Sequence, residues 1–236
     1  MTETADRVLE AVRPYALAYD NSVIMIVTVI FLACVFVLFR GKHLLAGRMS
    51  SFFSNKIASG GENGSDSTME VQHNIILTVV GCLSLGLIFT ATALTYEEGR
   101  QLVEPSPVGF LLKLSLWLMM VVVARGMVYS FVNWVFFDRE PSVRWKGAYY
   151  FLISLSALIL YPLAMLKVFL GVGNTVVTIC LLGLIITHKL LLFCKMFVNF
   201  RPRFHGSLLF FLYFCSVEIL PTLVVWQLLF ANNVYY

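Results

Sequence analysis

Asn21–Phe39 reads NSVIMIVTVIFLACVFVLF and contains no charged residue. A helix of about 20 residues crosses a hydrocarbon core about 30 Å thick, so this stretch is long enough to span a membrane. Because lipid offers no partners for backbone N–H and C=O groups, a crossing segment must satisfy them internally, as a helix. Five further stretches are similarly apolar: Ile75–Tyr96, Val108–Val135, Ala148–Leu170, Thr175–Phe197 and Ser207–Phe230. The sequence therefore predicts an all-α, polytopic membrane protein, a bundle of six transmembrane helices.

The composition agrees with this class. Apolar residues make up 59% of the 236 residues and charged residues only 13%, and the mean hydropathy is +0.85, well away from the balance of soluble proteins. We expect one transmembrane domain, residues 21–236, and no sizeable soluble domain. The net charge of +4 comes mainly from basic residues beside the apolar stretches. Positive-inside bias explains this charge more simply than binding to nucleic acid, so we expect the lipid bilayer as partner and no nucleic acid.

Basic residues gather in every second connection between the stretches. The connections after the first, third and fifth stretches hold nine Lys and Arg residues, whereas the other face holds three. Since basic loops stay in the cytoplasm, both termini should lie on the non-cytoplasmic side. The nine basic residues are Arg40, Lys42, Arg48, Lys56, Arg139, Arg144, Lys146, Arg201 and Arg203.

Two segments outside the apolar stretches have patterns of their own. Residues 1–20 form an N-terminal tail in which Ala5–Ala18 has apolar residues on one helical side, typical of an interfacial helix. Residues 40–73 form a cytoplasmic loop. Within it, His43–Ala58 mixes apolar and basic residues and suits either an interfacial helix or a solvated loop, whereas Ser59–Ser67 (SGGENGSDS) has nothing to bury and should be disordered.

The second apolar stretch is rich in small residues, which let helix backbones approach closely in a membrane. We therefore expect this helix to pack against several others. Its small residues are Gly81, Ser84, Gly86, Thr90, Ala91, Thr92 and Ala93.

Ionisable residues inside the stretches are the candidates for chemistry, because a charge there costs about 2.5–3.5 kcal/mol on insertion scales. Lys113, Lys167 and Lys195 lie near the ends of stretches and can extend to the interface. Arg125 lies deeper. Its guanidinium either reaches cytoplasmic headgroups or has a buried partner.

Glu218 lies midway along the sixth stretch and is the only acid in any of the six. Pro221, three residues later, removes a backbone hydrogen bond and can free a carbonyl near the same depth. A carboxylate beside a free carbonyl can bind a cation or relay a proton. The alternative is a protonated Glu218 that bonds to a neighbouring helix.

The partner of Glu218 can be sought by depth. The fifth and sixth stretches run in opposite directions, so His188 and Glu218 should lie within about one helical turn in height. A pair of Glu218 with His188 would suit a proton relay. An ion pair with Lys189 or with Arg125 is the alternative, and the sequence leaves all three open.

The run L-Y-F-C-S-V-E-I-L-P over Leu212–Pro221 resembles the closing L-Y-x-C-x-x-E-I-L-P signature of an uncharacterised integral membrane family of Bacteroidota, a domain of unknown function. The preceding Phe200–Phe204 (FRPRF) also resembles that family. The resemblance is specific near the C-terminus and compositional elsewhere. It implies a multi-pass protein of the bacterial inner membrane, with Glu218 and Pro221 as signature positions, and it implies no activity.

Other site classes have little support in the sequence. All five cysteines lie within apolar stretches and no C-x-x-C occurs, so we interpret them as small buried hydrophobes and expect no metal and no cofactor. Phosphate-loop, H-E-x-x-H and G-x-S-x-G motifs do not occur. Among the basic residues of the cytoplasmic face, four should bind anionic lipid headgroups: Arg139, Arg144, Arg201 and Arg203.

Three hypotheses for function follow. In the preferred one, the protein is a non-enzymatic accessory or assembly subunit of a membrane complex, whose polar intramembrane groups bind partner helices or further copies of the chain. In the second, it is a small permease or proton-coupled carrier with Glu218 as the coupling acid. In the third, it is an enzyme acting on a lipid-borne substrate, which would need clustered acids and bases at one interface.

Overall fold

The computed structural model describes residues 17–54, 64–103, 106–136 and 139–200. In these residues the chain forms helices and no strands. The elements are a 3-10 helix η1 (Leu17–Tyr19) and the α-helices α2 (Asn21–Ser54), α3 (Gly64–Ala93), α4 (Glu97–Val103), α5 (Pro107–Phe136), α6 (Arg139–Leu170) and α7 (Asn174–Phe200).

Five of these helices are long and apolar enough to cross a membrane, which confirms the first five predicted stretches. The spans are Asn21–Gly41, Met69–Ala93, Pro107–Phe131, Lys146–Leu170 and Asn174–Lys195. The predicted sixth helix, Ser207–Phe230, lies outside the described residues, as does the predicted interfacial helix of the N-terminal tail up to residue 16.

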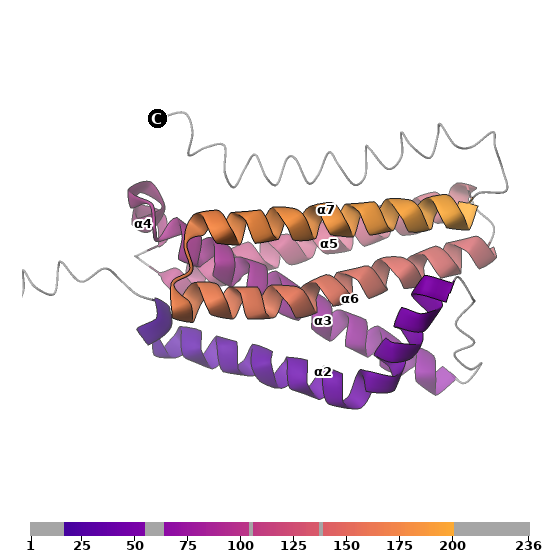
Figure 1. The fold of residues 1–236 in the computed structure, drawn as a ribbon, viewed down its shortest axis with the longest axis horizontal. Coiled ribbons are helices and arrows are strands. Elements are labelled where there is room, and N and C mark those ends of the chain that lie inside the picture. The colour runs from indigo at the N-terminus through magenta and orange to yellow at the C-terminus, as the bar shows by residue number, and fades with distance from the viewer. Residues whose placement is uncertain (1–16, 55–63, 104–105, 137–138, 201–236) are drawn as a thin grey trace, which may run out of the picture.

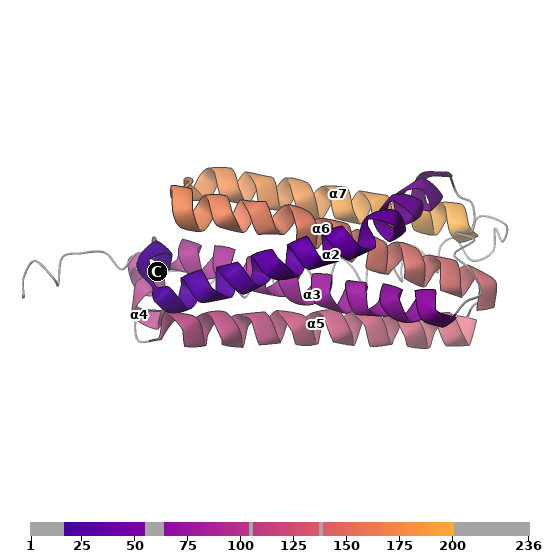
Figure 2. The same cartoon turned by 90° about the horizontal axis from the view of Figure 1, so that it is seen from below.

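The long helices run side by side along one axis (Figures 1 and 2). One end of the bundle, here called the α4 end, holds the start of α2, helix α4 and the turn between α6 and α7. The opposite end, the basic end, holds the span ends marked by Arg40 on α2 and Lys146 on α6. The halves of the bundle that adjoin these ends are called the α4 half and the basic half.

Helix α3 is the centre of the bundle, as its small residues predict. It packs against α2, α5 and α6, and half of its span is buried, whereas only 17% of the α5 and α7 spans is buried. A Cβ atom added at Gly81 would lie 3.0 Å from the Cβ of Ala157 on α6, and one at Gly86 would meet Ser115 Oγ on α5. Two glycines thus allow two different helices to approach the α3 backbone closely.

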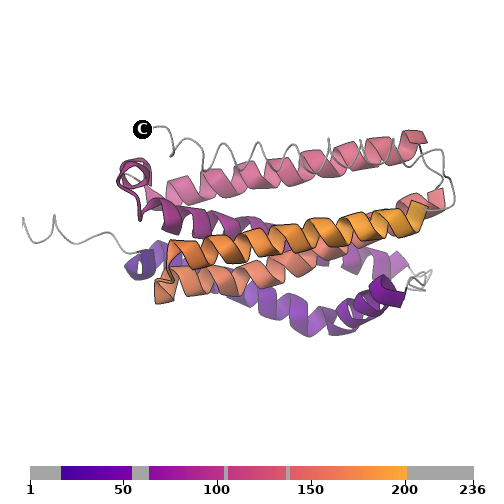
Figure 3. The same ribbon diagram turned by 45° about the horizontal axis from the view of Figure 1, so that its top comes forward.

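Short-range signals set the ends of two helices. Asp20 accepts a hydrogen bond from the backbone N–H of Ser22 at 2.8 Å and caps the start of α2. Gly171 adopts a left-handed conformation with φ +62°, which an L side chain would strain, and it ends α6. The turn Gly171–Gly173 is only three residues long, so α6 and α7 are antiparallel neighbours (Figure 3).

The connection expected over residues 40–73 is largely helical. Helix α2 continues to Ser54 and α3 begins at Gly64, so residues 64–67, expected to be disordered, lie in a helix. Helix α2 bends towards its C-terminal end (Figure 1). A Cβ atom at Gly41 would lie 2.7 Å from Cδ2 of the buried His73 on α3, so a glycine is needed for the two helices to meet there.

Candidate intramembrane site

The site begins with a bond between two helices that the short turn places side by side. Ser156 Oγ on α6 and His188 Nδ1 on α7 lie 2.8 Å apart. The single hydroxyl proton of Ser156 is accepted by the carbonyl of Leu152 at 2.9 Å. With that proton donated to Leu152, His188 in its Nδ1–H tautomer donates to Ser156.

Two further basic side chains lie close to His188. Lys189 follows it on α7, and both residues interact electrostatically with Arg125 on α5. All three side chains are half-buried. We call Arg125, His188 and Lys189 the intramembrane cluster. The sequence left these three residues as alternative partners of one acid, and the structure brings them together.

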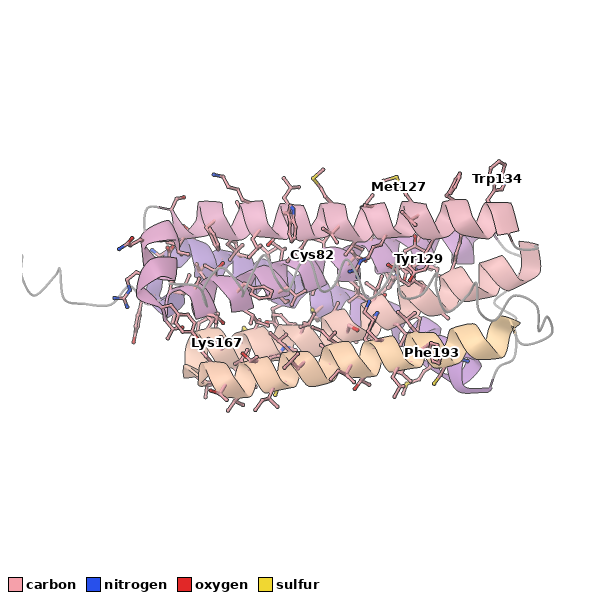
Figure 4. All side chains as sticks on the ribbon, turned by 90° about the horizontal axis from the view of Figure 1, so that it is seen from above. Cys82, Met127, Tyr129, Trp134, Lys167 and Phe193 are labelled. Carbon is pink, nitrogen blue, oxygen red and sulfur yellow. The ribbon has the colours of Figure 1, made fainter. Side chains whose placement is uncertain are left out.

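The neighbouring residues hold α5 and α6 close beside the cluster. A Cβ atom at Gly126, next to Arg125, would lie 3.4 Å from the hydroxyl oxygen of Tyr150 on α6. One residue earlier on α6, the ring of Tyr149 packs against Tyr129 of α5 with a centroid separation of 4.8 Å. Tyr129 points towards the interior in Figure 4, whereas Met127 and Trp134 of the same helix point away from the bundle.

A second interhelical polar bond lies at a similar depth. The hydroxyl of Ser154 on α6 donates to Asn74 Oδ1 on α3 at 3.1 Å and to the carbonyl of Tyr150 at 2.9 Å. Polar side chains of α6 thus bond to His188 of the cluster on one side and to Asn74 of the central helix α3 on the other. The sequence offered a signal for them, since Ser154 and Ser156 are polar residues within an apolar stretch and Asn74 directly precedes one, but only the packing shows which of them meet.

The cluster lies deep in the spans and nearer to the basic end. His188 is fourteen residues from the start of the α7 span at Asn174 and seven from its end at Lys195. At about 1.5 Å per residue, these separations are about 21 Å and about 10 Å. Arg125 is eighteen residues from Pro107 and six from Phe131. Both side chains are therefore at a depth where an ionised group is expensive without a partner or water.

The lysines expected to extend to the interface behave differently from one another. Lys113 is exposed on α5. Lys167 is only 7% exposed, and its ammonium donates to the carbonyl of Val172 at 3.1 Å and to Asn174 Oδ1. Asn174 Oδ1 also accepts from Thr95 Oγ1 at 3.3 Å. Lys167 therefore extends to the end of its span, as expected, and its ammonium stabilises the α6–α7 turn there.

The other predicted site residues cannot be placed. Glu218, Pro221, Arg201 and Arg203 lie outside the described residues. Arg139 and Arg144 belong to the first turns of α6 at the basic end, although the structure describes only their backbone.

The described cysteines do not share one environment. Cys34 and Cys82 are buried, as expected of small hydrophobes, but Cys180 and Cys194 are exposed on α7 and correct that expectation for the fifth stretch. Within the described ranges, no three His, Cys, Asp or Glu residues lie together as a metal site would require.

These helices and their polar interior define the class, a multi-pass α-helical membrane protein. A family model described as Domain of unknown function (DUF4271) matches residues 23–229, and the chain belongs to this family. The match includes four of the apolar stretches entirely and nearly all of the first and sixth, so it extends far beyond the C-terminal run Leu212–Pro221. Comparisons with curated proteins and with solved structures found no match.

Proposed function

We propose that this chain is an accessory or assembly subunit of a complex in the bacterial inner membrane. In this proposal it crosses the membrane six times, with its basic end in the cytoplasm and both termini outside. The nine basic residues beside alternate connections support that orientation.

The observation that carries the proposal is the core of the α4 half. It consists of packed aliphatic side chains from α2, α3, α5, α6 and α7, among them Ile30, Leu87, Leu111, Leu160 and Leu181. In the described residues, two hydrogen bonds between side chains of different helices, Ser154–Asn74 and Ser156–His188, lie in the basic half. A carrier needs polar groups that reach both faces, and such a core interrupts them.

Partner helices would find large apolar surfaces. On α5, the exposed large side chains repeat at spacings of three and four residues, which places them on one face of the helix. They include Leu112, Leu116, Met120, Met127 and Trp134. Figure 4 shows two of them, Met127 and Trp134, pointing away from the bundle. Lipid or the helices of another subunit can cover such a face.

The intramembrane cluster favours a second candidate, a small permease or proton-coupled carrier. His188, beside two basic side chains, could pass a proton to and from an intramembrane acid such as Glu218. This reading requires that water reach Glu218 during function.

Two experiments separate the candidates. Purification of the full chain in mild detergent, followed by identification of co-purifying proteins, should yield a stoichiometric partner if the chain is a subunit. A chain that is always recovered alone or as a homo-oligomer contradicts the subunit proposal. A water-soluble carboxyl-reactive probe, applied to native membranes, should modify Glu218 in a carrier and leave it unmodified in a subunit.

A further inference from the structure

We propose that Ser207–Phe230 packs along α5 and α7, and that Glu218 is the carboxylate that Arg125 and Lys189 bind within the bundle. The face of the bundle between α5 and α7 is thus covered by a segment of the same chain. The inference goes beyond the proposed function, because it holds for a subunit and for a carrier alike.

The packing of the described helices leaves a place for one more helix. Helices α5 and α7 each pack on other helices and make little direct contact with each other. Seen from above, they lie on the two sides of one face of the molecule, with α3 and α6 behind them (Figure 4). Their spans are the least buried of the five.

The length and direction of the chain also agree. Helix α7 ends with Phe200 at the basic end, and residues 201–236 follow. Six residues are available for the turn, and Ser207–Phe230 as a helix would be about 36 Å long, enough to return along the whole α7 span. Glu218 lies eleven residues after Ser207, and Lys189 lies eleven residues before Phe200. In two antiparallel helices joined by that turn, the carboxylate and the ammonium lie at the same depth.

Charge selects Glu218 as the partner. The five described spans contain two cations of the cluster, Arg125 and Lys189, and a single acid, Glu70. Glu70 is the second residue of the α3 span, at the basic end, where headgroups and water can reach it. A carboxylate delivered to the depth of Lys189 lowers the cost of both charges, and a bidentate Arg–carboxylate pair adds directional hydrogen bonds.

The proposed ion pair between Glu218 and Arg125 can be tested by exchanging the charges of the two residues. In the full-length chain, Glu218→Lys places a further cation in the cluster, and Arg125→Glu leaves two carboxylates facing each other. Each single variant should lose most of its monodisperse peak in detergent and show a lowered midpoint of thermal unfolding. The double variant Glu218→Lys with Arg125→Glu should regain most of both, because the pair is restored with reversed sign.

Two matched double variants make the exchange specific. Glu218→Lys combined with Lys113→Glu changes the same charges but uses an exposed lysine of α5, and it should give no rescue. Glu70→Lys combined with Arg125→Glu tests the competing pair and should give none either. Rescue in either control, or failure of the Glu218–Arg125 exchange, overturns the proposal.

A crosslink gives a readout that does not depend on charge. With the native cysteines replaced by serine, Ile186→Cys and Thr222→Cys should form a disulfide on mild oxidation in membranes, since these positions lie three residues before Lys189 and four after Glu218. Val35→Cys on α2, also exposed, should not crosslink to Thr222→Cys. Equal crosslinking of the two pairs, or crosslinking of the α2 pair alone, contradicts the proposed packing.

Discussion

The two halves of the bundle use their polar side chains differently. In the α4 half, the buried hydroxyls Ser84 Oγ, Ser115 Oγ and Tyr161 OH have no hydrogen-bond partner among the described residues. In the basic half, Ser154 and Ser156 bond to side chains of neighbouring helices. The α4 half has such bonds only at its edge, where Lys167 and Asn174 meet.

The two halves thus show two ways in which membrane helices associate: close van der Waals packing and interhelical hydrogen bonds. In lipid there is no hydrophobic drive for helices to associate, so contact must come from van der Waals packing or from interhelical hydrogen bonds. The middle of the bundle and the α4 half rely on van der Waals packing, through Gly81 and Gly86. The basic half adds interhelical hydrogen bonds. In the described structure, bonds between side chains of different helices thus lie deep within the basic half, but only at the edge of the α4 half. Each prediction below perturbs one side of this comparison.

The largest effect is expected at the contact between Gly81 and Ala157. Gly81→Leu would force α3 and α6 apart, because a Cβ alone would lie 3.0 Å from Ala157 Cβ, and overpacking typically costs about 1–3 kcal/mol or more. The midpoint of thermal unfolding in detergent should fall strongly. Gly47→Leu on α2, where no described residue lies within 4 Å of an added Cβ, is the matched control. Equal stability of the two variants would show that close packing does not hold the centre together.

The edge of the α4 half should be the next most sensitive. Asn174→Ala removes an acceptor from the buried ammonium of Lys167 and should cost about 2 kcal/mol, as hydrogen bonds to charged groups do. The double variant Asn174→Ala with Lys167→Met should be more stable than Asn174→Ala alone, since no ammonium then needs an acceptor. Additive losses in thermal unfolding would contradict the pairing.

At the bend of α2, Gly41→Ala should cost about 1–2 kcal/mol, because the added methyl group collides with a ring that is held in place. His73 Nδ1 lies 2.7 Å from the carbonyl of Met69, so the imidazole cannot turn away without losing that bond. Gly47→Ala in the same helix meets nothing within 4 Å and should be neutral. A limited-proteolysis pattern of residues 40–73 unchanged by Gly41→Ala, with unchanged stability, would exclude the contact.

The smallest effect compares serines of the two halves. Ser156→Ala removes the partner of His188 and should cost about 0.6 kcal/mol, the average for interhelical bonds in membrane bundles. Ser84→Ala in the α4 half removes a buried hydroxyl without a described partner and should be neutral or stabilising. Equilibrium unfolding in mixed micelles can resolve the difference, and a reversed order would show that the halves do not differ in this way.

The sequence predicted the parts of this fold that follow from the solvent. Lipid imposes helices, so five spans and the packing of α3 could be stated in advance. The sequence offered Arg125, His188 and Lys189 only as alternative partners of Glu218, and it did not predict that they lie near one another on α5 and α7.

The sequence did not predict two short helical segments or the acceptors of Lys167, because these depend on neighbouring helices that only the fold brings close. Residues 64–67 and helix α4 are polar and contain Gly, so their sequences are typical of loops. In the structure, residues 64–67 form the first turn of α3, and α4 packs against α3. Lys167 was expected to extend to the interface, but the sequence did not predict that carbonyl and amide oxygens of the α6–α7 turn would bind its ammonium there. Such choices depend on acceptors that only the fold brings near.

The central place of α3 also bears on how the protein is made. A ribosome delivers α3 to the membrane soon after α2 and well before α5, α6 and α7. The helix that touches α2, α5 and α6 is thus already inserted when two of those neighbours arrive. Each later helix can dock on a finished template as it leaves the translocon, and assembly can proceed in the order of synthesis.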